Sequence, residues 1–373
     1  MPIVIRSYKS DDKSSVGDFN KRLKKGGIRF QFPVDHIPEW LPNIDNRNIF
    51  QEHYLAIDSN SNVRGGYVLK HQVFYISGTT GTIGDYQLPI SEGVIDKAYN
   101  LVGLQLLSDA LKKQPLMYAL GMGGTDQPLP MFLKSMRWSL EPVPFYYKIL
   151  RPARFLRNIK SLRTSQVKKI MFDFLALSGL GWAGLKVKGL TGRASLDVRQ
   201  GKLSTQLLNQ FDNWVDDLWE KSRDHYSFIA VRDSETLNIL YPENNKRFIK
   251  LQIINDAQII GWAVLLCTDM SDHRQFGNMR VGTLVDCLAL PQRESEVILT
   301  ASKYLEKLKP DLIVTNQSFA GWISALEKTG FNRGPSNFVL AMSPKLVEAA
   351  GQPSENIPSF HFTRGDGDGP INL

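Results

Sequence analysis

Cysteine and histidine are scarce in this sequence, and none of its apolar stretches is long. Of 373 residues only Cys267 and Cys287 are cysteines, which are too few for a disulfide framework and lack the spacing of a metal site. The six histidines are scattered without ligand spacing, so we expect no bound metal. No run approaches the roughly 20 apolar residues that span a bilayer, and the first residues lack the apolar core of a secretion signal. These absences predict a protein of the reducing cytoplasm.

Positive charge, in contrast, is in excess. The formal net charge is +8 and the pI is near 9.3, which favours anionic partners such as nucleotide phosphates, acidic glycans or an anionic membrane surface. Aromatic and basic residues are not interleaved along one strand face as an RNA-binding sheet requires, so nucleic-acid binding is not expected. The sequence also contains neither a Gly-x-Ser-x-Gly elbow nor a Walker loop.

One short motif occurs twice. GTIGDYQLP begins at Gly81 and GTLVDCLALP at Gly282, and each places an aspartate, Asp85 or Asp286, in a predicted buried strand. The same order of elements surrounds both: three strands, a helix, a strand, a helix and a strand. This repeat indicates a duplicated domain, in a chain long enough for two. The predicted elements are 53–58, 64–76, 81–89, 97–113, 115–122, 130–138 and 144–150, then 247–254, 259–267, 282–291, 295–309, 311–316, 321–331 and 337–343.

The end of the second repeat carries a family resemblance. LEKTGFNRG (326–334), followed by a strand, resembles the closing segment of GNAT acyltransferases, in which a helix ends in a Tyr-x-x-x-Gly-Phe pattern. FLKSMRW (132–138) is a weaker copy, and the chain more distantly resembles the Fem-type aminoacyltransferases. The resemblance implies an α/β (α+β) fold with two GNAT-like domains, each a mixed, mostly antiparallel sheet flanked by helices. The expected divisions are an N-terminal domain 1–150, a linker 151–204, a C-terminal domain 205–347 and a tail 348–373.

The chemistry that this resemblance implies is acyl transfer from a thioester to an amine, with acetyl-CoA or another acyl-CoA as co-substrate and no metal. In that fold a carboxylate on the fourth strand often removes the amine proton, and Asp85 and Asp286 stand on that strand. His71, on the preceding strand, is expected close enough to relay a proton. The alternative for each aspartate is a structural role, in which it accepts hydrogen bonds from nearby backbone N–H groups.

The acyl donor is expected in the V between the fourth and fifth strands. There, backbone N–H groups polarise the thioester, and a helix N-terminus holds the pyrophosphate. The residues expected to line or flank this V are Asp85, Gln87, Leu88, Ile90, Ser91, Glu92, Gly93 and Asp126 in the first repeat, and Asp286, Leu288, Leu290 and Arg293 in the second.

Two features of the family are missing from both repeats. The phosphate loop, Arg/Gln-x-x-Gly-x-Gly/Ala, is replaced by ISEGVIDKAYN (90–100) and QRESEV (292–297), although its glycines are what let the backbone approach a phosphate. The tyrosine that usually protonates the leaving thiolate is replaced by Leu133 and Leu326. Fem-type enzymes also lack a clean phosphate loop, which leaves a different acyl donor open.

The expected activity is N-acyl transfer to an amino group, on an amino sugar or a similar cell-envelope or polysaccharide precursor. The alternatives are Fem-type aminoacyl transfer and, from another class, a catalytically inactive tandem GNAT binding module in a polysaccharide assembly system. The first repeat is the expected catalytic one, because it carries His53, Tyr86 and Gln87 around its aspartate and buried polar groups cost stability unless they serve a function. Cys287 and Leu288 beside Asp286 look like core instead.

Residues 151–189 combine nine Lys and Arg with an apolar stretch that includes Phe172, Phe174 and Trp182. This is the pattern of an interfacial helix on an anionic membrane, which would place the protein peripherally at the inner face of the membrane. The alternative is a linker helix packed across the two repeats. The tail FTRGDGDGPINL (362–373) is either a flexible end or an ordered segment that folds back onto the protein.

Overall fold

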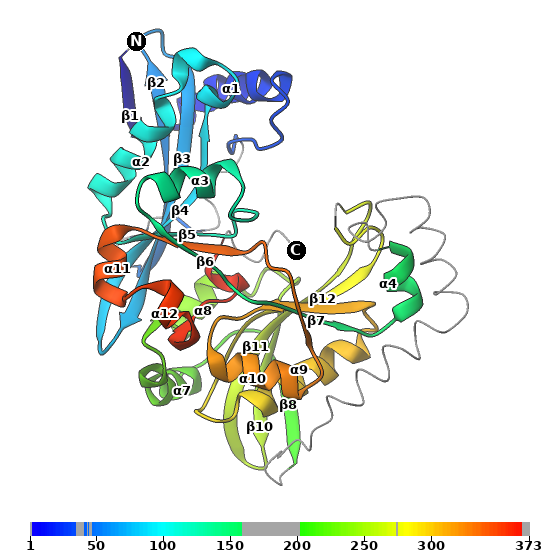
Figure 1. The fold of residues 1–373 in the computed structure, drawn as a ribbon. Coiled ribbons are helices and arrows are strands. Elements are labelled where there is room, and N and C mark those ends of the chain that lie inside the picture. The colour runs from blue at the N-terminus through cyan, green and yellow to red at the C-terminus, as the bar shows by residue number, and fades with distance from the viewer. Residues whose placement is uncertain are drawn as a thin grey trace. The chain divides into compact units, whose positions relative to one another are not determined.

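The computed structural model describes residues 2–34, 41–42, 44, 47–158, 202–273 and 275–367. The chain divides into two compact units (Figure 1). Unit 1 consists of Met1–Glu141 and Val339–Glu355, and unit 2 of Pro142–Phe338 and Asn356–Leu373.

Unit 1 is built on a mixed sheet in the order β1-β2-β3-β4-β5-β15-β6. The strands β1 to β4 pair antiparallel in sequence, β4 and β5 are parallel, and β5 pairs antiparallel with β15. A two-residue turn with positive φ at Ser77 and Gly78 joins β3 to β4, which is the geometry that suits the twist of a hairpin. The strands are β1 (Ile3–Ser7), β2 (Ile49–Asp58), β3 (Val63–Ile76), β4 (Thr79–Ser91), β5 (Met117–Leu120), β6 (Ser139–Pro142) and β15 (Val339–Met342).

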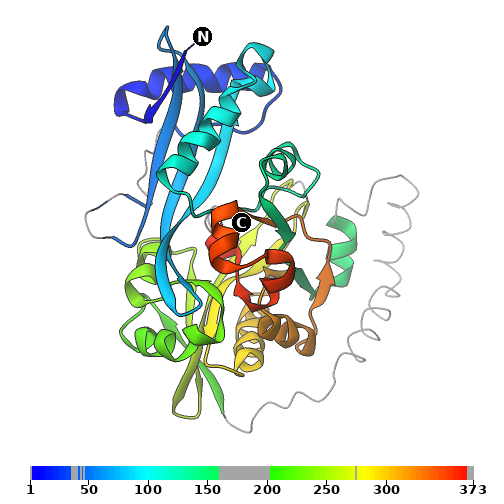
Figure 2. The same cartoon turned by 60° about the vertical axis from the view of Figure 1, so that its left-hand side comes forward.

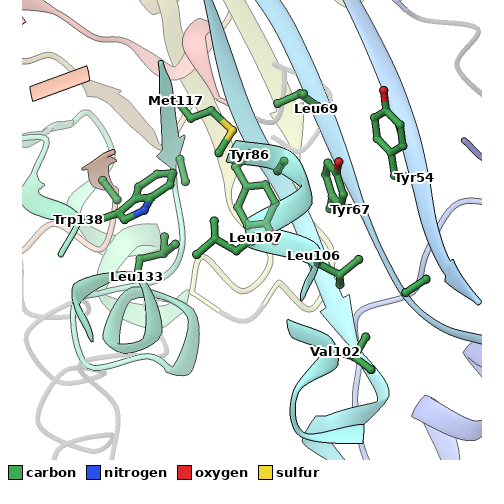
Figure 3. Close-up of a cluster of buried hydrophobic side chains, with 14 residues drawn as sticks. Tyr54, Tyr67, Leu69, Tyr86, Val102, Leu106, Leu107, Met117, Leu133 and Trp138 are labelled. Atoms are coloured by element: carbon green, nitrogen blue, oxygen red, sulfur yellow. The ribbon is translucent and has the colours of Figure 1, made fainter. Parts of the chain in front are cut away.

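Helices cover both faces of this sheet, because its central strands are buried on both sides. The helix α1 (Lys13–Lys25) packs with Val68 and Ile90 on one face. The helix α2 (Val102–Lys113) packs on the other face against tyrosines of the strands, and Figure 3 shows its leucines beside them. Figures 1 and 2 show α1 and α2 on either side of β2 to β4. The remaining helices of unit 1 are α3 (Pro128–Ser135), α11 (Pro344–Ala350) and α12 (Pro353–Asn356).

Unit 2 repeats this plan with a sheet in the order β14-β7-β13-β12-β11-β10-β8. Gly261 in this sheet corresponds to Gly65 in the first, because each lies close under a helix. A Cβ added at Gly261 would lie 2.6 Å from Val297 of α9, and one added at Gly65 would lie 3.0 Å from Val102 of α2. Its strands are β7 (Phe145–Ile149), β8 (Leu203–Leu208), β10 (Ile249–Asn255), β11 (Gln258–Asp269), β12 (Arg280–Ala289), β13 (Leu312–Asn316) and β14 (Asn332–Gly334), with β9 (Phe228–Ala230) pairing with β16 (Phe360–His361). The helices that the structure describes in unit 2 are α4 (Pro152–Asn158), α7 (Trp214–Ser222), α8 (Ser234–Leu240), α9 (Glu294–Lys307) and α10 (Ala320–Lys328).

The predicted fold is confirmed: two mixed, mostly antiparallel sheets are each flanked by helices, in the repeated order. The membership of two strands differs from the prediction. β7, expected to close the first domain, pairs with β13 and β14 of the second sheet, and β15, expected to close the second, pairs with β5 of the first. The boundaries therefore fall near 142 and 339 instead of 150, and residues 356–367 belong to unit 2 instead of forming a separate tail.

The predicted interfacial segment, 151–189, is described only over its first eight residues, which contain α4. Residues 159–189 lie outside the described residues. Among the helices that the structure describes, none combines the length and apolar character needed to cross a membrane.

Candidate active site

In unit 1 the two parallel strands stay paired over only two residues. Gly84 and Asp85 pair with Met117 and Tyr118, and β4 then continues to Ser91 without a further partner on β5. A bulge interrupts the pairing of β4 with β3 just beyond, where Leu88 has φ +45°. A leucine in this conformation stores local strain, which clusters at functional sites. The predicted V therefore begins at Asp85, with Leu88 on its β4 side.

A row of polar side chains crosses the sheet at this point. Gln51, Lys70, Asp85 and Tyr118 are direct cross-strand partners, so their side chains share one face. Lys70 and Asp85 are each 1% exposed, and the Lys70 Nζ lies 3.8 Å from the Asp85 Oδ2. Gln87 donates to the same Oδ2 at 2.7 Å and accepts from the Gln51 Nε2 at 2.8 Å. The ammonium and the amide donor both favour the ionised carboxylate, which is the form that can accept a proton.

The register contradicts the predicted proton relay by His71. Because His71 follows Lys70 on β3, its side chain points to the face opposite Asp85. There its Nε2 lies 2.9 Å from the Glu52 Oε2, and its ring stacks on Phe50 with centroids 4.6 Å apart. The hydrogen bond with His71 lowers the pKa of Glu52. His71 therefore forms a hydrogen bond with Glu52 on the opposite face of the sheet from Asp85.

The segment that replaces the phosphate loop is organised around Glu92. Its carboxylate accepts from the Arg22 Nε at 2.7 Å and from the Arg64 Nη1 at 3.0 Å, and it is 4% exposed. Arg64 also pairs with Asp58 at 2.8 Å. Glu92 thus has its charge neutralised by two arginines, and this network stabilises the turn between β4 and α2. Its predicted role was to line the donor site, but its contacts in the structure are those of a structural anion.

The other predicted donor residues of unit 1 have varied surroundings. Ser91 caps the turn by accepting from the Gly93 N–H at 3.1 Å, and a Cβ at Gly93 would lie 2.5 Å from the Tyr99 carbonyl oxygen. Ile90 packs in the α1 core, whereas Asp126 is exposed in the loop before α3. Of the predicted set, the structure brings only Asp85, Gln87 and Leu88 together at the V.

In unit 2 the corresponding strands separate as well, but the chain itself occupies the gap. β12 and β13 pair only through Val281–Thr283 and Leu312–Val314. We call residues 360–367 the tail segment. Its Thr363 forms a bridge with Gln317, just after β13, while the His361 Nε2 lies 3.1 Å from the Cys287 carbonyl oxygen of β12. The tail segment is therefore ordered and contacts both strands at the point where they separate.

Asp286 takes part in this closure. It is fully buried, and its carboxylate pairs with the Arg232 Nε at 2.9 Å and accepts from the Tyr241 hydroxyl at 2.9 Å and the Thr363 hydroxyl at 3.2 Å. Asp366 pairs with the same guanidinium at 2.5 Å. Burial raises the pKa of Asp286 to about 6; the nearby Asp366 carboxylate also raises it, whereas Arg232 lowers it. These contacts indicate a structural role for Asp286, which is the alternative to the predicted role as a base.

The remaining predicted residues of unit 2 are also committed to the fold. Leu288 is fully buried, Leu290 donates its backbone N–H to the Ile260 carbonyl at 2.9 Å, and Arg293 pairs with Glu296 at 3.3 Å. Among the described residues, no cluster of three His, Cys, Asp or Glu is arranged to hold a metal ion.

Lys70 was not predicted from the sequence as a partner of Asp85, although the hairpin turn indicates this pairing. The Ser77–Gly78 dipeptide suits a two-residue hairpin turn, and counting back from that turn places Lys70 opposite Asp85. Arg232 and Asp366 were missed as well. No sequence signal pairs two buried charges that lie so far apart in the chain.

No protein-family model and no curated protein sequence matches the chain. Several solved structures do. A fungal multi-domain GH3 β-N-acetylglucosaminidase with a GCN5-related glucosamine N-acetyltransferase region has a TM-score of 0.52 at 12% identity; the match covers 91% of this chain and 38% of that one. Saccharomyces cerevisiae N-myristoyltransferase with bound myristoyl-CoA has a TM-score of 0.50 at 11% identity, covering 92% of this chain and 80% of that one.

A GCN5-related N-acetyltransferase from Anabaena variabilis has a TM-score of 0.52 at 8% identity, with 91% of this chain and 72% of that one covered. Identities this low are evidence of a shared fold. The chain therefore has the fold of the GCN5-related N-acetyltransferases (GNAT), present in two copies, as its sequence resemblance implied.

Proposed function

We propose that this protein is an N-acyltransferase that moves an acyl group from an acyl-CoA to an amino group, with the chemistry in unit 1. The observation that carries this proposal is the contrast between the two V-shaped strand pairs. In unit 1, Asp85 lies in a row of polar side chains where β4 leaves β5. In unit 2, the equivalent place is filled by the tail segment, and Asp286 is bound by it.

The reaction needs a base for the amine and a place for the thioester. The amine nitrogen attacks the thioester carbonyl, the C–N bond forms, and the C–S bond breaks to release the thiolate of coenzyme A. We assign the amine proton to the Asp85 carboxylate, received directly or through one water. Lys70 and Gln87 are positioning residues in this scheme, because both contact the Asp85 carboxylate and orient it.

The unit 1 residues fit the acyl and pantetheine part of the donor better than its phosphates. The β4 backbone beyond Asp85 has no ladder partner on β5, which leaves backbone groups available to an extended ligand. Glu92, in contrast, places a carboxylate where the family has glycines, although Arg22 and Arg64 neutralise it. The structure of yeast N-myristoyltransferase contains myristoyl-CoA, and this supports an acyl-CoA as the donor here.

For the acceptor we propose an amino sugar or a similar envelope or polysaccharide precursor. Two observations support this class: the fungal structure with a like fold contains a glucosamine N-acetyltransferase region, and the net charge of +8 favours acidic glycans and their precursors.

Native mass spectrometry of the whole chain tests this proposal, using acetyl-CoA, longer acyl-CoAs and free coenzyme A. We expect one coenzyme A ligand per chain, and release of free thiol when glucosamine is added to the acyl-CoA complex. Binding at 100 times the dissociation constant should also add about 2.7 kcal/mol to the stability of the folded state. Absence of any binding or thermal shift at millimolar ligand would refute an acyl-CoA enzyme.

The Glu92 network favours a second candidate, an inactive tandem GNAT that binds a ligand or partner. A carboxylate held by two arginines occupies the segment where the family binds phosphate, and neither repeat has the tyrosine acid. The same experiment separates the two candidates, because the inactive module would bind an acyl-CoA or a glycan without releasing thiol for any amine.

A further inference from the structure

Arg364 is a cation for which the described part of the chain provides no counter-ion. Its side chain forms no hydrogen bond or ion pair with any residue that the structure describes, and its guanidinium carbon lies 5.9 Å from the centroid of the Phe338 ring. The Nε atom is shielded from solvent and has no hydrogen-bond partner among the described residues. The residue as a whole is partly exposed, and the two terminal nitrogens are not shielded in the same way. The Nε end of the guanidinium is therefore buried, and its two terminal nitrogens are accessible to a ligand.

Several other arginines of the protein that are buried or partly buried have carboxylate partners, and Arg364 differs from them. Arg232 pairs with two carboxylates, and Arg64 pairs with Asp58 and Glu92. Proteins pair buried charges in this way because an unpaired one is costly. A cation–π contact offsets only part of that cost. Burial also lowers the pKa of Arg364 to about 10, which leaves it charged at neutral pH.

The turn that carries Arg364 is fixed on both sides. Thr363 accepts from the Gly365 N–H and binds Asp286, and Asp366 pairs with Arg232 and caps the turn through the Thr363 N–H at 2.8 Å. A Cβ at Gly365 would collide with the hydroxyl of Tyr241. The backbone is thus held by a buried hydrogen bond on one side of Arg364 and by a buried ion pair on the other, and this fixes the point from which the side chain reaches a ligand.

We propose that Arg364 is an oxyanion-binding residue, whose terminal nitrogens take a carboxylate or phosphate group of a substrate. The planar fork of an arginine matches two oxygens of either group. The phosphates of the acyl donor and an acidic group on the acceptor are the two sources of this chemistry. The assignment of the anion to a substrate rests on the proposed function, whereas the oxyanion site itself does not.

The test compares the full-length protein with Arg364→Gln and Arg364→Lys, using calorimetric titration with inorganic pyrophosphate and with acetate at constant ionic strength. Arg333→Gln is the matched control, because Arg333 is an exposed arginine of the same unit. We expect Arg364→Gln to weaken pyrophosphate or acetate binding about tenfold or more, since a hydrogen bond to a charged group contributes about 1.5–3 kcal/mol. Arg364→Lys should retain part of the affinity, and Arg333→Gln all of it.

A stability measurement separates this role from a structural one. Removal of an unpaired cation should leave the ligand-free melting temperature of Arg364→Gln unchanged or higher, whereas a structural arginine would lower it. The proposal is overturned if Arg364→Gln binds both anions as the wild type does, or if Arg333→Gln weakens binding equally. Titrations with coenzyme A and glucuronate then identify the source: loss of affinity for the first indicates the donor phosphates, and loss for the second an acidic acceptor. Coenzyme A binding that persists in Arg364→Gln leaves the proposed function standing.

Discussion

Asp85→Asn is expected to reduce acyl transfer by about 10²–10⁴-fold, the usual contribution of general base catalysis. The amide keeps the shape of the carboxylate and can still accept the hydrogen bond from Gln87, but it cannot take the proton of the amine. The measurement is thiol release from acetyl-CoA with glucosamine as acceptor. Asp11→Asn is the control, because Asp11 is an exposed aspartate of the same unit, and it should retain full activity.

The single variant also removes the carboxylate 3.8 Å from the buried Lys70 ammonium, so some loss of stability accompanies it. The double variant Lys70→Met/Asp85→Asn removes both charges, and we expect it to recover that stability while turnover remains lost. If Asp85→Asn keeps most of its activity, or if the double variant recovers activity together with stability, Asp85 is not the base.

The largest stability effect is expected from Arg232→Met in unit 2. Arg232 is fully buried and is the cation shared by Asp286 and Asp366, so its removal leaves two buried carboxylates without compensation. Breaking a buried pair costs about 3–5 kcal/mol. We expect a loss of at least this size in urea denaturation at pH 7.5. Asp286→Asn should cost less, because one arginine and one carboxylate remain, and it should leave turnover nearly unchanged.

The pH dependence of the Arg232→Met loss gives a second signature. Without the guanidinium, the folded-state pKa of Asp286 rises further above its unfolded value, and the pKa of Asp366, which is lowered in the wild type, loses the lowering effect of Arg232. The folded variant therefore binds protons that the unfolded chain does not. The variant is therefore stabilised as the pH falls through the raised folded pKa values, and its deficit at pH 5 should be smaller than at pH 7.5. A deficit that is equal at both pH values would show that lost packing, not uncompensated charge, is the cause.

Local patterns in the sequence predicted the elements of this fold well. The apolar periodicity around Asp85 and Asp286 and the repeated order of elements were sufficient for two mixed sheets with flanking helices. The exchange of β7 and β15 was not predictable, because it leaves the order of elements along the chain unchanged. β7 and β15 are both short apolar strands that can pair with the exposed edge of either sheet. No local residue pattern indicates which of the two sheets each strand joins.

The candidate site was predicted in part. Asp85 and Gln87 are two residues apart on one strand, so period-two alternation alone places them on one face. The error over His71 came from neglecting the hairpin register, which places it on the other face. The closure of unit 2 depends on Asp286 meeting Thr363 and on Arg232 meeting Asp366. Contacts between segments so distant in sequence come from the tertiary fold alone.

Hydrogen–deuterium exchange of the whole protein, with and without saturating coenzyme A, tests most directly the claim that unit 1 holds the donor while the tail segment closes unit 2. We predict slower exchange in residues 84–93, where β4 leaves β5, and no change in residues 284–291, at the end of β12 and just beyond it, or in the tail segment. Slower exchange in 284–291, with faster exchange in the tail segment as it is displaced, would contradict the account and place the donor in unit 2.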